Sequence, residues 1–396
     1  MRTAPFLRPA ALALLCGACQ VVLGIEHRDV ADLAAHDAAP TPTDGAVAAF
    51  DAAVDAGVEC PPDQTACGRA CFDLGSEGEH CGSCEHSCRG AVCRFGECVP
   101  ELMLNVSTSA AVFAYRNEVL VRVIADKALS EDPNGTLHAF DTGTRVDRPL
   151  GVAGAYLDMV VDGDLGIAIE TYPSSPRVRT IDLRTGSDFV VYAQQTLVPA
   201  FRRIVKDGDD LFWTTRADVR TVHRDGTGYK VLKTVTEGTN GAGPCLVLDP
   251  TRIFFGVEDT PYIWSIPRSG GVGELADTGL KDATEMIPWS STQYLWWNRR
   301  EVRLAPFDSG SVVAIPTQVV GAQGGPHGAV RVGDAVYWVD AYGGGPANEA
   351  RILRLDVPTK KQTVLLSRQK DIGNLAVVGD FIYYAHFGAG LYRIAL

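Results

Sequence analysis

The sequence is poor in the features that mark several large classes of protein. Its 36 lysines and arginines are outnumbered by 48 aspartates and glutamates, for a formal net charge of −12. The basic surface that neutralises nucleic acid phosphates is therefore not expected. A Gly-Xaa-Ser-Xaa-Gly elbow, a His-Glu-Xaa-Xaa-His zinc motif and a Gly-Lys-Ser/Thr phosphate loop are all missing. We predict no nucleic acid partner, no metal and no cofactor.

Long apolar runs are also missing, and the one short run has the pattern of an export signal. Arg2 and Arg8 flank the start of this run, at residues 10–15, and small residues follow it. The run is shorter than the roughly 18 residues that cross a bilayer as a helix, and no later stretch reaches that length. The rest of the chain is therefore expected on the far side of the inner membrane.

The apolar run continues into residues 15–19, with the sequence Leu-Cys-Gly-Ala-Cys. This segment resembles the lipobox of bacterial lipoproteins. The resemblance implies that residues 1–18 are a signal peptide and that Cys19 is lipidated and becomes the mature N-terminus. Gln20 follows, in place of the Asp that retains some lipoproteins at the inner membrane, so anchoring at the outer membrane or cell surface is implied. Ordinary cleavage, giving a secreted or periplasmic protein, is the alternative.

Residues 19–59 are expected to hold the lipid attachment site and a disordered tether. The part from residue 26 onward is rich in Ala and Asp, and Pro40, Pro42 and Gly45 interrupt any periodicity. Apart from Phe50, it has almost no large apolar side chain to offset the entropy of ordering. We therefore predict a flexible, self-repelling segment.

Residues 60–98 hold a dense, even set of cysteines. In an exported chain such a set predicts a disulfide framework of four bridges, whose pairing the spacing leaves open. A zinc site is the rival interpretation, because His80 and His86 lie near Cys81, Cys84 and Cys88. The oxidising compartment favours disulfides. The predicted disulfide cysteines are Cys60, Cys67, Cys71, Cys81, Cys84, Cys88, Cys93 and Cys98.

The spacing of these cysteines resembles that of small Cys-rich modules in predicted bacterial surface lipoproteins. The resemblance covers residues 60–98, and it implies a spacer or an adhesion-like element. It carries over no catalytic residue.

Residues 100–396 contain a weak repeat at a spacing typical of propeller blades, roughly 40–48 residues. Each copy has an apolar strand, a Gly-Asp or Asp-Gly turn, an aromatic strand and a third strand that alternates apolar and basic residues. The clearest copies span residues 204–226, 330–356 and 377–394, more diverged copies span 246–268 and 294–308, another opens at 160–164, and the earliest covers 112–143.

This repeat predicts an all-β fold, a β-propeller of seven blades, with six and eight as alternatives. A single small sheet cannot bury its faces alone, so aromatic side chains such as Trp213, Trp297 and Trp338 are expected between blades. The last copy ends without an outer strand, which residues 102–106 are free to supply. The aromatic strands at 211–214 and 336–340 resemble those of YWTD and NHL-like propellers, which mostly bind proteins or sugars, while some are lyases or hydrolases.

Candidate site residues come from the position just before each innermost strand, which lines one mouth of the channel in such propellers. Most are polar, and polar lining of a wet channel is the simplest interpretation. The binding candidates are Asp158, Arg202, Glu285, His327 and Asn374. Among them, His327 with Asp158 or Glu285 is a candidate acid–base pair. Cys245 holds the same position in another copy and is expected to be a buried, inert thiol rather than a nucleophile beside His327.

Every strong signal in the sequence is architectural. We therefore predict an envelope lipoprotein that displays a propeller for binding a protein or glycan, with membrane contact through its lipid only. The alternatives are an extracellular lyase or hydrolase at the channel mouth and a purely structural envelope component.

Overall fold

The computed structural model describes residues 58–84, 86–124, 135–170, 176–194, 201–236, 242–257, 260, 262–278, 283–298, 301–308, 311–316, 326–341, 349–370 and 372–396. The predicted signal peptide, Cys19 and the tether up to residue 57 lie outside these ranges. Every regular element within them is a strand. These residues include no helix long and apolar enough to cross a membrane.

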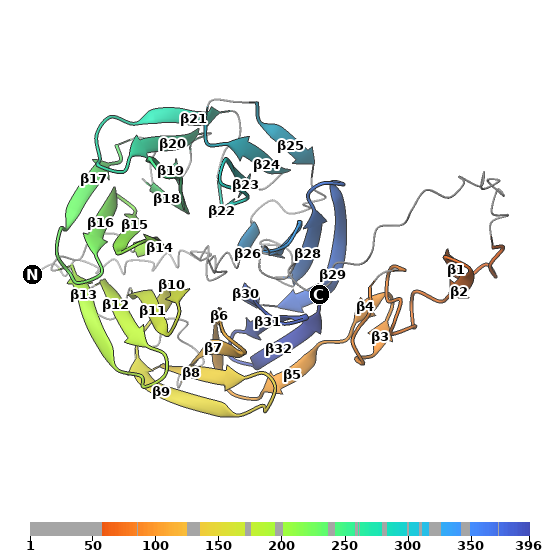
Figure 1. Ribbon diagram of the computed structural model, residues 1–396. Coiled ribbons are helices and arrows are strands. Elements are labelled where there is room, and N and C mark those ends of the chain that lie inside the picture. The colour runs from red at the N-terminus through yellow and green to blue at the C-terminus, as the bar shows by residue number, and fades with distance from the viewer. Residues whose placement is uncertain are drawn as a thin grey trace, which may run out of the picture.

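The strands form seven four-stranded antiparallel sheets, arranged as blades around a central axis (Figure 1). The predicted all-β propeller with seven blades is confirmed. Blades 1 to 3 contain β6 (Thr108–Tyr115), β7 (Glu118–Val123), β8 (Thr136–Asp141), β9 (Asp147–Ala153); β10 (Tyr156–Asp162), β11 (Leu165–Glu170), β12 (Arg177–Asp182), β13 (Asp188–Ala193); and β14 (Phe201–Asp207), β15 (Asp210–Thr215), β16 (Asp218–His223), β17 (Lys230–Thr234). Blades 4 to 6 contain β18 (Ala242–Leu248), β19 (Arg252–Val257), β20 (Tyr262–Pro267), β21 (Glu274–Thr278); β22 (Glu285–Pro288), β23 (Gln293–Trp297), β24 (Glu301–Pro306), β25 (Val313–Pro316); and β26 (Pro326–Val332), β27 (Ala335–Ala341), β28 (Glu349–Asp356), β29 (Lys361–Lys370).

Blade 7 closes the ring with strands from both ends of the propeller. Its inner three strands are β30 (Ile372–Val378), β31 (Phe381–His386) and β32 (Gly390–Ala395), and its outer strand is β5 (Glu101–Leu104). The Arg393 guanidinium also donates to the Glu101 carboxylate at 2.8 Å. The expected closing strand is therefore present, and it removes the exposed edge that β32 would otherwise have.

The turns after the innermost strands explain the repeated glycines. Gly163, Gly208, Gly333 and Gly379 have φ values of +58°, +57°, +57° and +58°. This left-handed conformation is open to glycine without steric cost, and it suits a tight two-residue hairpin. The Gly-Asp repeat is thus a consequence of the blade geometry.

The apolar core lies between the blades, as the repeat predicts. Trp297 of blade 5 and Trp338 of blade 6 are both fully buried, with ring centroids 6.1 Å apart. Trp213 of blade 3 packs in a cluster that also holds Ile167 and Ile169 of blade 2. These tryptophans therefore belong to blade interfaces and not to a ligand cage.

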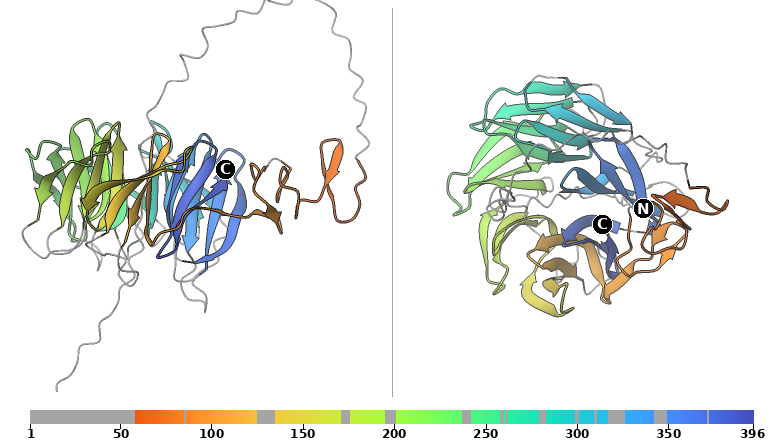
Figure 2. Two further views of the ribbon diagram at one scale, coloured as in Figure 1. Left: turned by 90° about the horizontal axis from the view of Figure 1, so that it is seen from below. Right: turned by 45° about the vertical axis from the view of Figure 1, so that its right-hand side comes forward.

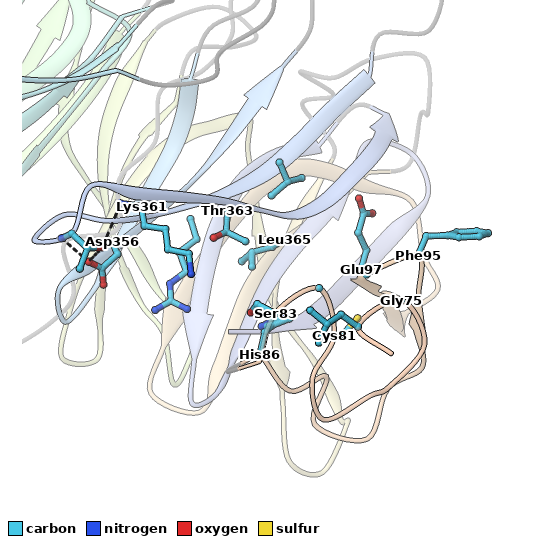
Figure 3. Close-up of a pocket in the computed structure, with 16 residues that line it drawn as sticks. Gly75, Cys81, Ser83, His86, Phe95, Glu97, Asp356, Lys361, Thr363 and Leu365 are labelled. Carbon is cyan, nitrogen blue, oxygen red and sulfur yellow. Dashed lines mark hydrogen bonds between the residues drawn. The ribbon is translucent and has the colours of Figure 1, made fainter. Parts of the chain in front are cut away.

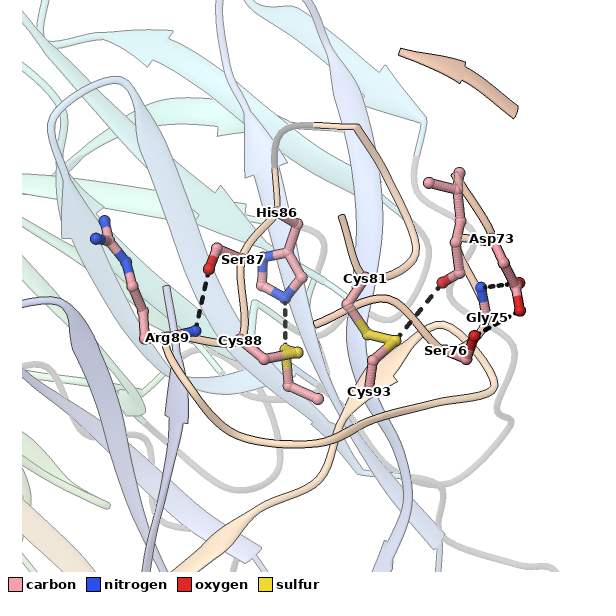
Figure 4. The surroundings of a disulfide bond; sticks show 11 residues. Asp73, Gly75, Ser76, Cys81, His86, Ser87, Cys88, Arg89 and Cys93 are labelled. Carbon is pink, nitrogen blue, oxygen red and sulfur yellow. Dashed lines mark hydrogen bonds between the residues drawn. A yellow bond between two sulfur atoms is a disulfide. The ribbon is translucent and has the colours of Figure 1, made fainter. Parts of the chain in front are cut away.

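The Cys-rich module precedes the propeller and has little regular structure. It contains β1 (Thr65–Cys67), β2 (Ala70–Phe72), β3 (Cys93–Arg94) and β4 (Glu97–Cys98). All eight predicted cysteines form disulfides, and Figure 4 shows the surroundings of one of them. The bridges are Cys60–Cys71, Cys67–Cys84, Cys81–Cys93 and Cys88–Cys98.

The module lies against the outer edge of the ring, beside the C-terminal blades (Figure 2). Its strand β4 contacts β29, the outer strand of blade 6. There the Glu97 carboxylate accepts a hydrogen bond from the Ser367 backbone N–H at 3.0 Å. An exposed ion pair links Arg89 to Asp380 of blade 7 at 3.9 Å. The module is thus a docked part of the molecule and covers a sheet edge.

Replacing Cys88 and Cys98 together with alanine should make the module open at lower urea concentrations. This bridge is buried at the module's centre, and a loop of its size contributes on the order of 2–3 kcal/mol by restricting the unfolded state. Limited proteolysis in urea, followed by mass spectrometry, locates the first cleavages. The matched control replaces Cys60 and Cys71, whose loop is of similar size but more exposed. If both variants were cleaved at the same urea concentration, burial of the Cys88–Cys98 bridge would not contribute to the stability of the module.

Candidate functional site

The candidate residues from the sequence lie on the innermost strands, around the axis of the ring. Asp158 is on β10, Glu285 on β22 and Asn374 on β30, and all three are at most 1 % exposed. They are therefore buried in the protein rather than exposed at an open mouth.

Each of these three side chains binds the backbone of the next blade. The Asp158 carboxylate accepts from Met159 N at 3.0 Å in its own strand and from Ile204 N at 2.9 Å in blade 3. Glu285 of blade 5 accepts from Gly328 N of blade 6 at 2.9 Å. Their polar atoms thus fasten neighbouring blades together near the axis.

Asn374 makes the same kind of link where the ring closes. Its Oδ1 accepts from Val112 N at 2.7 Å, and its Nδ2 donates to the Val112 carbonyl. Val112 is on β6 of blade 1, and Asn374 is on β30 of blade 7. This pair of hydrogen bonds adds a second closure on the inner side of the ring.

A buried arginine joins the two carboxylates. Arg203 on β14 is 1 % exposed; its Nη1 lies 3.7 Å from Asp158 Oδ2 and its Nη2 lies 3.8 Å from Glu285 Oε1. The side chain of this blade 3 residue therefore reaches carboxylates of both blade 2 and blade 5. We call Asp158, Arg203 and Glu285 the axial triad.

Burial governs the protonation of the axial triad. Desolvation raises the pKa of Asp158 to about 6, against the opposing charge of Arg203. Desolvation also raises the pKa of Glu285 to about 8, where Arg203 again opposes it and the negative charge of Asp158 adds to it. Burial therefore favours the neutral form of both carboxyls, and the guanidinium between them opposes this shift in each.

Arg203 is one residue from the sequence candidate Arg202. Arg202 is half-buried, and a β-bulge falls between Phe201 and Arg203. The distance to the turn glycine identifies Arg203 as the corresponding residue of blade 3. Asp158 and Asn374 each stand five residues before their turn glycines, and Arg203 stands five residues before Gly208.

The same count places Gly328, not His327, at the corresponding position of blade 6. A side chain at Gly328 would meet the Cα of Asn374 at 2.5 Å, so only glycine fits there. His327 is half-buried, and its Nε2 lies 3.3 Å from the Ile372 carbonyl oxygen. Cys245 is fully buried in an apolar cluster with Phe254 and Met286.

The carboxylates near the axis link neighbouring blades. A general acid or base must reach a substrate atom within hydrogen-bond distance, directly or through one water. Asp158 and Glu285 are both 0 % exposed and are engaged by backbone N–H groups and by Arg203. These carboxylates therefore stabilise the ring and are closed to a polymer or metabolite.

An open groove lies elsewhere, between the module and blade 6, and has a volume of about 680 Å³ (Figure 3). Blade 6 contributes Arg354, Lys361 and Thr363, and the module contributes Ser83, Phe95 and Glu97. The sequence did not indicate this site, because its two walls are more than 250 residues apart along the chain.

The module offers no thiolate ligand set for a metal among its described residues. The sulfur atoms of Cys81, Cys88 and Cys98 lie within 4.8 Å of one another. Each is in a disulfide, however, so none is a thiolate. His86 Nε2 lies 3.2 Å from the Cys98 sulfur, which has no hydrogen in the disulfide and can only accept a hydrogen bond.

No protein-family model matches this sequence, and no curated protein matches it. Among solved structures, the chain is similar to virginiamycin B lyase from Staphylococcus aureus, with a TM-score of 0.58 and 12% identity over 75% of this chain and 100% of that one. It is similar to oligogalacturonate lyase from Vibrio parahaemolyticus, with a TM-score of 0.53 and 10% identity over 74% and 91% of the two chains.

A third similar structure is that of YCF48 bound to the D1 peptide, with a TM-score of 0.52 and 13% identity over 75% of this chain and 95% of that one. At these identities the likeness shows a shared fold. Since the group includes both lyases and a protein bound to a peptide, the fold does not select a function.

Proposed function

We propose that this protein is a cell-envelope lipoprotein that displays its propeller to bind a protein or glycan partner. The observation that carries the proposal is the state of the axial residues. Asp158 and Glu285 are buried and bonded to neighbouring blades, so recognition falls to the outer surfaces of the molecule. The four disulfides are consistent with an exported protein.

In this proposal, residues 1–18 direct export, Cys19 carries the lipid, and residues 19–59 form the tether. The docked module and the propeller are then held together at a distance from the membrane. The resemblance of residues 15–19 to a lipobox supports the anchor. The resemblance of the aromatic strands to YWTD and NHL-like propellers supports a role in binding.

Lipid attachment predicts that an alkyne-labelled fatty acid supplied to a bacterial host is incorporated into the protein. The Cys19→Ala variant should lose the label and leave the membrane fraction, because the modified thiol would be gone. Cys16→Ala is the matched control, and it should keep the label. A label that survives in Cys19→Ala, or disappears equally in both variants, would argue for ordinary cleavage and a secreted or periplasmic protein.

The binding role is tested by probing the purified full-length protein against glycan arrays and immobilised envelope proteins. We expect saturable binding to one partner class. A protein that binds neither and only supports envelope integrity would be the structural component considered above. The lyase or hydrolase alternative receives less support, because two of its acid–base candidates, Asp158 and Glu285, are fully buried and bonded to neighbouring blades.

A further inference from the structure

The groove between the module and blade 6 has two walls, one from each part of the molecule. One wall is formed by β28 and β29, and the other by module loops that the disulfides Cys81–Cys93 and Cys88–Cys98 cross-link. The hydrogen bond from Ser367 N to Glu97 holds the walls together. Figure 3 shows that Asp356 and Lys361 lie at one end of the groove and Phe95 at the other.

The charges of the groove are unevenly satisfied. Its carboxylates accept backbone hydrogen bonds but keep their charges: Asp356 accepts from Thr359 N at 2.9 Å and Glu97 accepts from Ser367 N. Arg354 and Lys361, in contrast, form no ion pair within 4.0 Å among the described residues. Arg354 instead lies over the Tyr337 ring, at 6.0 Å from its centroid. The pKa of the Asp356 carboxyl is lowered by hydrogen bonds from Thr359 and further by the charges of Arg354 and Lys361. Neither cation is held in a direct ion pair with a described residue, so both can still reach an anionic ligand.

Phe95 is unusual in both conformation and exposure. It occupies the turn between β3 and β4 with a φ of +54°, a conformation that costs a bulky residue roughly 1 kcal/mol, and it is 90 % exposed. Asn or Gly would adopt this conformation with less strain. Because the Phe95 ring is almost fully exposed, replacing it would lose little buried apolar surface. The ring projects to solvent from a hairpin whose flanking residues, Cys93 and Cys98, are both in disulfides (Figure 3).

Peptide addition to the edge of β29 fits the groove less well. An added strand needs a continuous row of free backbone groups. Here β4 already lies against β29, and Glu97 occupies the N–H of Ser367. The part of β29 that lines the groove lies within residues 361–365, half of the strand, so an entering strand would find a short edge.

We propose that this groove binds an anionic oligosaccharide, a chain of sugar units that carry carboxylate or sulfate groups. Arg354 and Lys361 pair with the acidic groups, Ser83 and Thr363 offer hydroxyls to the sugar, and the Phe95 ring provides an apolar face for a unit at the far end. The inference rests on the proposed binding function and specifies its site and ligand class.

The test is calorimetric titration of the full-length protein, purified with its disulfides intact. The probes are an oligomannuronate, a sulfated oligosaccharide, a neutral mannan oligomer of the same length, and an oligoglutamate peptide. We expect at least one anionic oligosaccharide to bind. The dissociation constant of the neutral oligomer should be at least tenfold higher. The first two probes distinguish carboxylated from sulfated ligands.

Two variants locate the binding. Arg354→Gln combined with Lys361→Gln should weaken binding tenfold or more, whereas Lys230→Gln on exposed β17 should not change it. Phe95→Asn should also weaken binding while leaving the module at least as stable, because Asn tolerates a positive φ. Phe189→Ala, which removes an exposed ring on blade 2, is its control.

Several outcomes would overturn the proposal. These are the absence of anionic oligosaccharide binding at millimolar concentration, equal binding of the neutral oligomer, tighter binding of the acidic peptide, and unchanged binding in the groove variants. If another partner is bound and the groove variants retain it, the proposed binding function stands and the groove assignment falls. If no partner of any class is bound, both fall.

Discussion

Replacing Arg203 with methionine should lower the free energy of unfolding by about 3–5 kcal/mol near pH 7.5. The guanidinium lies between the carboxyl groups of Asp158 and Glu285, and all three side chains are at most 1 % exposed. Without Arg203, Asp158 would lose the charge that opposes its desolvation, so the folded protein would have to bury an unpaired carboxylate or protonate it. Denaturant unfolding followed by tryptophan fluorescence measures the loss, since Trp213 lies in the same blade.

The neighbouring residue provides a matched control for this prediction. Arg202→Met removes the guanidinium of the adjacent residue, which is half-buried. It should lower the free energy of unfolding much less than Arg203→Met. Adding Asp158→Asn to Arg203→Met should recover part of the loss, because the amide oxygen can still accept from Ile204 N without a charge. Equal losses in Arg202→Met and Arg203→Met, or no recovery in the double variant, would show that the axial triad is not the cause.

Glu285→Gln should make the protein more stable than the unmodified chain above pH 8. In the folded protein the pKa of Glu285 is about 8 and that of Asp158 is about 6, both above their ordinary values. Between about pH 4.5 and 8 the folded state therefore holds protons that the unfolded chain has released. Stability from these groups is fully present at low pH and falls as the pH rises through the folded pKa values.

The expected slope for one such group is at most about 1.4 kcal/mol per pH unit. Glu285→Gln removes this titration and keeps an acceptor for Gly328 N, so the difference between variant and parent should grow from pH 5 to pH 9. Comparing the two proteins cancels the titrations of groups distant from Glu285, including that of His86, whose pKa burial lowers. Glu274→Gln, at an exposed ion pair with Arg252, is the surface control. A constant difference across this range would contradict the assignment.

Much of the fold follows from local patterns in the sequence. The Gly-Asp turns, the aromatic second strands and the repeat spacing together predict a seven-bladed propeller. The incomplete last copy predicts the closing strand at residues 102–106, and the structure pairs Leu102 and Leu104 with β32. Turns and alternating strands are determined by neighbouring residues, so a single sequence carries these signals.

The candidate site was less accessible from the sequence. Asp158, Glu285 and Asn374 were expected just before the innermost strands, at an open mouth, but they lie within those strands. Nothing in the sequence indicated that their polar atoms bind the next blade. Arg203 was missed by one position, because the bulge after Phe201 changes which side chain faces the axis. A shift of one residue in a strand reverses the direction of its side chains.

The sequence by itself determined the all-β repeat, the closing strand and the presence of a disulfide framework, because each depends on residues close together or on simple composition. The tertiary structure alone decided which cysteines pair, that Arg203 meets Glu285, and that Phe95 and Lys361 border one groove. Such contacts join residues distant along the chain, and they depend on the curvature of the ring and the docking of the module. Burial and pKa follow from that packing, since desolvation is a property of the assembled fold.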